Sequence, residues 1–70
     1  MTLNDLKRLK AKLPVNWAEK IAETTGVSAD MVRKVLRNDR NNQVVIDAAI
    51  ELAIHYQEEL RKKAESIKSI

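Results

Sequence analysis

Three cations recur at helical spacing near the middle of the chain, namely Arg33, Lys34 and Arg37. Ala29 and Asp30 precede them, and residues three or four positions apart share one face of a helix. Guanidinium and ammonium groups bind anionic oxygen atoms and other hydrogen-bond acceptors. An acidic neighbour such as Asp30 repels anions, and it therefore restricts which anionic partners can bind. The pattern therefore indicates a surface that recognises a polar, negatively charged partner.

Two short helices joined by a tight turn, within residues 18–37, are predicted to position this surface. Ile21 and Ala22 give the first helix an apolar side. Gly26 is the only glycine in the chain, and it stands where that helix must stop. Glycine adopts the left-handed conformation there without a Cβ penalty. Ser28 is a favourable N-cap for the second helix. The buried side of the second helix is predicted from its apolar spacing, at Val32, Val35 and Leu36.

This arrangement is typical of a DNA-binding helix-turn-helix, whose second helix needs one buried side and one side free to enter a groove. The charge distribution agrees, because residues 1–40 carry nine Lys/Arg and five Asp/Glu, whereas residues 41–70 carry four and five. Neutralisation of phosphates supplies much of the affinity for nucleic acids. The alternative interpretation is a helical hairpin whose basic side is an ordinary solvated surface.

The string IAETTGVSADMVRKVL resembles the lambda repressor and Cro superfamily, with local similarity to the N-terminal segment of lactose-repressor-family regulators. The matching elements are the small Ala22, the turn at 26–28, and Val32 with Val35 inside. The resemblance is close around this string and looser as far as Leu52. A helix before the motif favours the lambda repressor and Cro layout. The resemblance implies an all-α, four-helix, lambda-repressor-like domain with an extended C-terminal helix.

The same resemblance implies roles for individual side chains. In those families the first residues of the second helix and its next outward turn meet base edges. Base contacts are thereby assigned to Ala29, Asp30 and Lys34, base or phosphate contacts to Arg33 and Arg37, and a phosphate contact to Ser28. Lysine or arginine reads guanine, and alanine contacts a thymine methyl group. Asp30 departs from the neutral polar residue usual there, and it either accepts from a cytosine amine or complements the helix dipole.

A first helix is predicted over residues 2–12, because Thr2 and Asp5 match a capping box and leucines recur along one side. Pro14 ends this helix, since the residue before a proline is displaced from the helical region. Asn16 is the predicted cap of the next helix, with Glu19 completing a second capping box.

Further candidate phosphate contacts flank the two motif helices. Asn16 and Trp17 stand at the start of the first one, the end that approaches the DNA backbone in related folds. Alternatively, Trp17 packs against the first helix as a lid on the core. Residues 38–43, NDRNNQ, form a polar linker in which Asn38 is the predicted left-handed residue and Arg40 a phosphate contact. The alternative is a solvated loop.

The longest helix is predicted from Val44 to about Lys68, with a polar stripe at Asp47, Glu51 and His55 in its otherwise apolar first half. A helix that is apolar around most of its circumference must be covered on more than one side. We therefore expect a homodimer seam, formed by Ile46, Ala53, Tyr56, Leu60 and Ile67. Lys63 interrupts this repeat, and the alternative is a monomer with a frayed end. The predicted domains are a DNA-binding domain over residues 1–56 and a dimerisation segment over residues 57–70.

Composition argues against several other functions. The chain has no cysteine and a single histidine, so it offers no convincing metal site. It also has no serine, histidine and carboxylate set and no phosphate-cradling glycine loop. We therefore expect no enzyme, no cofactor and no small-molecule ligand. The sequence contains neither a run of about 18 apolar residues nor the apolar core of a signal peptide, which favours a cytoplasmic protein with no membrane span.

The predicted function is sequence-specific binding of double-stranded DNA by a small transcriptional regulator that acts as a homodimer on half-sites about 34 Å apart. Two alternatives remain open. One is a DNA-binding accessory protein of a phage or mobile element, acting in excision or packaging. The other is a helical protein-interaction module that binds no DNA. A steep loss of DNA affinity with salt distinguishes the DNA binders from the interaction module.

Overall fold

Four α-helices form the fold in a computed structural model that describes residues 2–68. They are α1 (Leu3–Ala11), α2 (Trp17–Thr25), α3 (Ala29–Leu36) and α4 (Gln43–Lys68). The described part of the chain contains no strand, so the predicted all-α class and the order of the helices are confirmed. Met1 and the last two residues of the predicted dimerisation segment, Ser69 and Ile70, lie outside the described residues.

The first helix begins with the predicted capping box. The Thr2 backbone N–H donates to Asp5 Oδ2, and the Asp5 backbone N–H donates to Thr2 Oγ1, both at 3.2 Å. Hydrogen bonding of the Asp5 carboxylate to the Thr2 backbone N–H, and secondarily to the Thr2 side chain, holds the pKa of the Asp5 carboxyl below its ordinary value. α1 ends before Pro14, as the sequence predicts. The capping box thus sets the residue at which α1 begins.

The turn between α2 and α3 forms around Gly26, whose φ of 74° lies in the left-handed region. Its N–H donates to the Ala22 carbonyl at 2.8 Å, which closes the last turn of α2. The Thr25 hydroxyl donates to the Ile21 carbonyl at 2.8 Å and accepts from the Val27 N–H at 3.3 Å. The predicted role of Gly26 is confirmed, and the threonine adds a local bond that fixes the path of the chain into α3.

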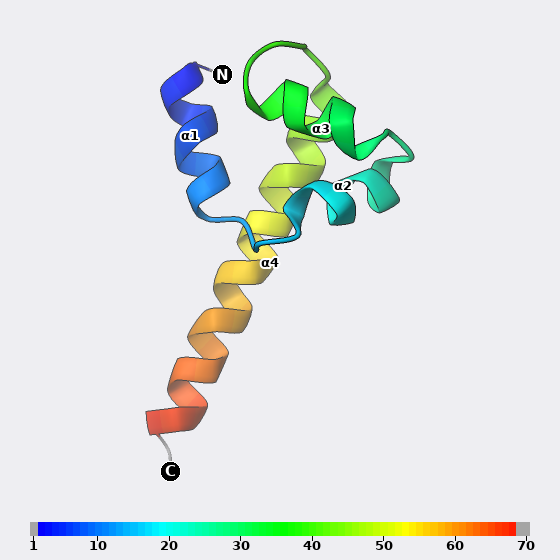
Figure 1. The fold of residues 1–70 in the computed structure, drawn as a ribbon. Coiled ribbons are helices and arrows are strands. Elements are labelled where there is room, and N and C mark those ends of the chain that lie inside the picture. The colour runs from blue at the N-terminus through cyan, green and yellow to red at the C-terminus, as the bar shows by residue number, and fades with distance from the viewer. Residues whose placement is uncertain (1, 69–70) are drawn as a thin grey trace.

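The core lies where α2 and α3 pack on α4 and on each other, with α1 against α3 and α4 (Figure 1). It contains apolar side chains from all four helices, and the largest of those that are fully buried are Ile21, Val32, Val35, Leu36 and Val45. No polar or charged residue is buried anywhere in residues 2–68. Because the described interior holds no titratable group, polar chemistry within residues 2–68 takes place on the surface.

The fourth helix begins at a cap that the sequence analysis did not identify. Asn42 Oδ1 accepts from the N–H groups of Val44 and Val45, at 3.1 and 3.4 Å. α4 has 26 residues and is therefore about 39 Å long. The other helices cover its first part, and its lower half in Figure 1 runs clear of them. The boundary lies at Gln57, whose amide donates to the Lys12 carbonyl at 3.2 Å. All side chains of residues 57–68, here called the α4 extension, are exposed.

Candidate nucleic-acid interface

The third helix buries one side in the core and leaves the other accessible. Asp30, Arg33 and Arg37 are exposed, and Lys34 is half-buried. Ala29 is also half-buried, because it packs partly against the core. We call these five residues the α3 edge. The predicted separation of an apolar side from a polar side on this helix is confirmed.

Each cation of the α3 edge lies beside a carboxylate. Arg33 Nη2 is 2.9 Å from Glu19 Oε1 on α2, and Lys34 Nζ is 3.2 Å from Asp30 Oδ2 one turn earlier. The third pair joins Arg37 Nε to Asp39 Oδ2 at 3.3 Å. All six side chains are at least 40% exposed, so water and salt screen the three pairs.

These ion pairs change the electrostatic character expected for the α3 edge. Three carboxylates match the three cations there, so the edge and its acidic neighbours are close to neutral as a group. The excess positive charge of residues 1–40 is instead carried by the cations of α1 and by Lys12, Lys20 and Arg40. An anionic partner of the α3 edge must therefore replace carboxylates as the partners of Arg33, Lys34 and Arg37. Exposed pairs of this kind contribute about 0–1 kcal/mol, so an anionic partner can replace these carboxylates at a small cost in free energy.

The α2–α3 ion pair is one that sequence reasoning missed. Glu19 is predicted to complete a capping box with Asn16, and the structure shows that this prediction is wrong. The Asn16 side chain makes no capping hydrogen bond, and its backbone lies outside the extended conformation typical of an N-cap. The Glu19 carboxylate turns to Arg33 instead, because the fold places a guanidinium within its reach. The i, i+3 capping pattern gives no signal for this contact across the turn.

The remaining predicted contacts lie at the margins of the α3 edge. Ser28 caps α3 as expected, since its Oγ accepts from the Met31 N–H at 3.2 Å. This bond occupies the hydroxyl oxygen as an acceptor, and the hydroxyl hydrogen remains a donor for an anion. Trp17 is half-buried and packs against the core, as its predicted role as a lid requires. Its predicted phosphate contact stays a prediction.

The loop after α3 contains both of the features predicted for it. Asn38 adopts the left-handed conformation with a φ of 68°, and the Asp39 N–H donates to the Lys34 carbonyl at 2.9 Å. Arg40 is exposed two residues later, and among residues 2–68 it has no carboxylate within ion-pair distance. Arg40 is therefore available to an anion without first leaving another partner.

The predicted dimer seam is divided by the fold. Ile46 and Ala53 are buried in the chain's own core, where α4 meets the other helices. Tyr56 is half-buried, Leu60 is 42% exposed and Ile67 is 73% exposed. Heptad spacing predicted all five residues together because they share one side of α4. The domain covers the first part of that side and leaves the rest accessible.

A groove of about 590 Å³ lies between the end of α1 and the middle of α4. Its floor is apolar and its rim is polar, and it is lined by Leu9, Lys12, Ile50, Ala53, Ile54, Gln57, Glu58 and Arg61. Ile54 is 53% exposed in this groove. Sequence patterns could not reveal the groove, because it requires the end of α1 to lie beside the middle of α4.

The described residues include no helix that is long and apolar enough to span a membrane. They also include no group of three or more His, Cys, Asp or Glu side chains placed to hold a metal ion. The chain was compared with protein-family models, curated proteins and solved structures, and none of them matches it.

Proposed function

We propose that the protein binds double-stranded DNA sequence-specifically, with the α3 edge in the major groove, as a small transcriptional regulator. In this proposal the fold is of the lambda-repressor-like helix-turn-helix type, and the protein acts in the cytoplasm as a homodimer. The observation that carries the proposal is a short helix after a glycine-capped turn, sealed on its apolar side and polar on its accessible side. Major-groove readers have this construction, because a helix that enters a groove must be anchored from behind.

The side chains of the α3 edge suit base recognition better than general attraction to phosphates. Lys34 and Arg33 carry the donors that read guanine, and Ala29 is small enough to admit a thymine methyl group. Asp30 and Glu19 oppose indiscriminate binding, because each adds negative charge close to the phosphates. Hydrogen bonds to the correct bases offset this repulsion, whereas mixed-sequence DNA does not supply them. We therefore expect modest non-specific affinity and clear sequence preference.

Arg40, Lys20 and the N–H groups at the start of α2 supply backbone contacts in this proposal. Phosphate contacts set the position and orientation of a DNA-binding protein, and base contacts set its specificity. The accessory-protein alternative uses the same surface and differs in what the bound protein recruits. The protein-interaction alternative is favoured by one observation, the exposed apolar side chains of α4.

Selection of bound duplexes from a random pool tests sequence preference directly. The selected site is then titrated beside a scrambled duplex, at about 50 and 200 mM salt, with the wild-type chain and Lys34→Ala. We expect a preferred sequence, affinity that falls steeply with salt, and a loss on the selected site that the scrambled duplex does not show. Glu51→Gln, on the outer side of α4, serves as a surface control that should leave specificity unchanged.

The result that overturns the proposal is absence of DNA binding at the lower salt concentration, where electrostatic attraction is strongest. That outcome would favour the protein-interaction module. Binding without sequence preference would overturn specific recognition and would leave the α3 edge as a phosphate-binding surface.

A further inference from the structure

We infer that a second copy of this chain covers the apolar side of the α4 extension, with the two extensions packed antiparallel. This side consists of Leu60, Ala64 and Ile67, together with Tyr56 just before the extension, and we call these four residues the extension stripe. The inference deepens the homodimer part of the proposed function by naming the surface and the orientation. It does not require that the dimer bind DNA.

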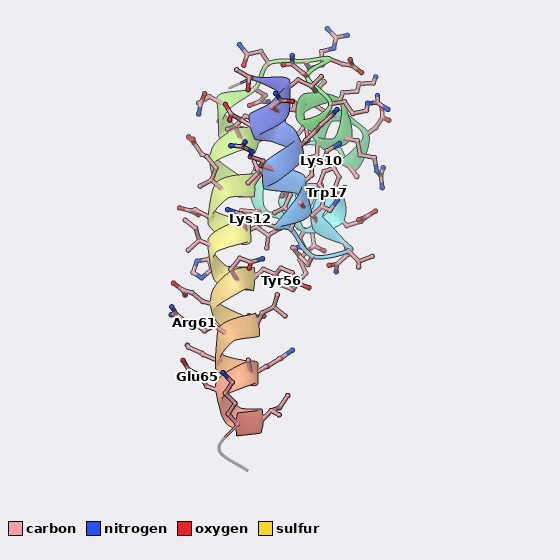
Figure 2. The ribbon with its side chains drawn as sticks, turned by 90° about the vertical axis from the view of Figure 1, so that its left-hand side faces the viewer. Lys10, Lys12, Trp17, Tyr56, Arg61 and Glu65 are labelled. Atoms are coloured by element: carbon pink, nitrogen blue, oxygen red, sulfur yellow. The ribbon has the colours of Figure 1, made fainter. Side chains whose placement is uncertain are left out.

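The extension stripe continues the core-facing side of α4 into solvent. Ala49 and Ala53 are buried beneath the other helices, and at helical spacing the same side then carries Tyr56 and Leu60. Figure 2 shows Tyr56 on one side of the lower half of α4, with Arg61 and Glu65 extending from the other. The helix therefore keeps an amphipathic pattern where its own domain has nothing left to cover it. A second helix of the same pattern is a suitable cover, because an isologous pair presents the same surface twice.

The order of charges along the extension selects the antiparallel orientation. Glu59 and Lys63 lie one turn apart on one flank of the extension stripe, and Arg61 and Lys68 lie on its other flank. An antiparallel pair centred near Arg61 places Glu59 of each copy level with Lys63 of the other. A parallel pair would place like charges beside each other and would bring the two domain bodies to the same level. Antiparallel packing instead separates the bodies to opposite ends.

The same arrangement accounts for Lys63, the residue that interrupts the apolar repeat. In a pair centred near Arg61, Lys63 lies level with Glu59 and Leu60 of the second copy. Its methylene stem then packs on Leu60, while its ammonium group reaches the Glu59 carboxylate. Beside a purely apolar helix, the Lys63 ammonium group would lose water without gaining a partner. Beside a second copy of this chain, it gains the Glu59 carboxylate. It also fixes the register, as a polar seam residue does in other helix pairs.

The groove between α1 and α4 extends the contact beyond the extension itself. Residues 57–68 give a paired length of only about 18 Å, which is short for a specific interface. The antiparallel register brings Ile67 of the second copy level with Tyr56, next to the groove where Ile54 is 53% exposed. We therefore expect a reversible dimer at the small end of specific interfaces.

Sedimentation equilibrium of the full chain, from about 10 to 500 µM, measures the pairing. We expect a monomer–dimer equilibrium that Leu60→Glu weakens about a hundredfold, because two carboxylates enter the apolar contact and each costs about tenfold. Val44→Glu is the matched control. Val44 is 61% exposed at the other end of α4, and this variant should dimerise within about twofold of wild type. Circular dichroism confirms that both variants keep their helices. A wild-type chain that stays monomeric throughout, or a Leu60→Glu chain that still dimerises, overturns the inference.

Disulfide trapping tests the orientation, because the chain has no cysteine of its own. Chains with Tyr56→Cys are mixed with chains with Ile67→Cys and oxidised. In the antiparallel pair the two positions meet, whereas two copies of residue 56 are about 16 Å apart, beyond the reach of a disulfide. We expect the mixed disulfide to exceed either self-disulfide at least about fivefold. Self-disulfides as abundant as the mixed one indicate a parallel pair and overturn the orientation, as does the absence of any disulfide.

These experiments separate the dimer from the proposed function. Leu60→Glu leaves every residue of the α3 edge unchanged. A chain that dimerises as described but binds no DNA disproves the proposed function and supports the inference. A wild-type chain that binds DNA but never dimerises supports the proposed function and disproves the inference.

Discussion

Substitution of Glu19 by glutamine tests whether the α3 edge meets DNA. The Glu19 carboxylate is 2.9 Å from the Arg33 guanidinium, and both side chains are about half exposed. Glu19→Gln keeps the size of the side chain and a hydrogen-bond acceptor, and it removes one negative charge. Two effects on DNA binding follow. Arg33 becomes free to contact a phosphate, and a carboxylate that repels phosphates disappears.

The size of the effect follows from the geometry of the pair. Two unit charges 2.9 Å apart in bulk water attract each other by about 1.4 kcal/mol, which corresponds to a tenfold change in affinity. Measured exposed pairs are weaker, about 0.2–1 kcal/mol, because salt and side-chain entropy oppose them. We therefore expect Glu19→Gln to raise affinity for mixed-sequence DNA about two- to fivefold at low salt. If Arg33 neutralises one further phosphate, the slope of log affinity against log salt becomes steeper by about 0.9.

Fluorescence anisotropy with a labelled mixed-sequence duplex, at four or five salt concentrations, measures both quantities. Glu51→Gln is the matched control, because it removes the same charge from the outer, exposed side of α4. In the described part of the chain Glu51 makes no ion pair. The control should raise affinity slightly and leave the slope unchanged. If Glu19→Gln and Glu51→Gln behave alike, neither Glu19 nor Arg33 lies close to phosphate, and the proposed docking, which places the Glu19 carboxylate beside the DNA backbone, is wrong.

Three further expectations concern single residues. Lys34→Ala should cost about 1–3 kcal/mol on the selected duplex and much less on a scrambled one, measured by the same titration, and equal losses would exclude base recognition by Lys34. Gly26→Ala should lower the free energy of unfolding by about 1–2 kcal/mol in urea melts, because the new Cβ meets no neighbour but the backbone is left-handed, and Gly26→Asn should cost less. The pKa of the Asp5 carboxyl is lowered in the folded chain, so its capping contribution is present above the ordinary carboxyl pKa and is lost as pH falls through the lowered value. Acid titration followed by NMR should show α1 loosening there, and Asp5→Asn, which removes the titrating carboxyl, should abolish that dependence.

Local physics explains why the helices could be predicted from the chain. The capping box of Thr2, the left-handed positions of Gly26 and Asn38, and the N-cap of Ser28 each depend on neighbours within four residues. The buried sides of α2, α3 and the first half of α4 follow from apolar spacing, because a helix must turn its apolar stripe inward. The one local prediction that the structure contradicts is the capping box of Asn16 and Glu19. The Glu19 carboxylate pairs instead with Arg33, which is 14 residues away.

The sequence by itself determined the helices, their ends and the side that each one buries, because these depend on short-range hydrogen bonds and periodicity. Only the tertiary structure decided which surfaces meet. It paired Glu19 with Arg33, 14 residues away, and joined Gln57 to the Lys12 carbonyl across 45 residues. It also divided the apolar side of α4, burying Ala53 and leaving Leu60 exposed. Periodicity places a side chain on a face of its own helix, but the chain's packing in space determines what lies opposite that face.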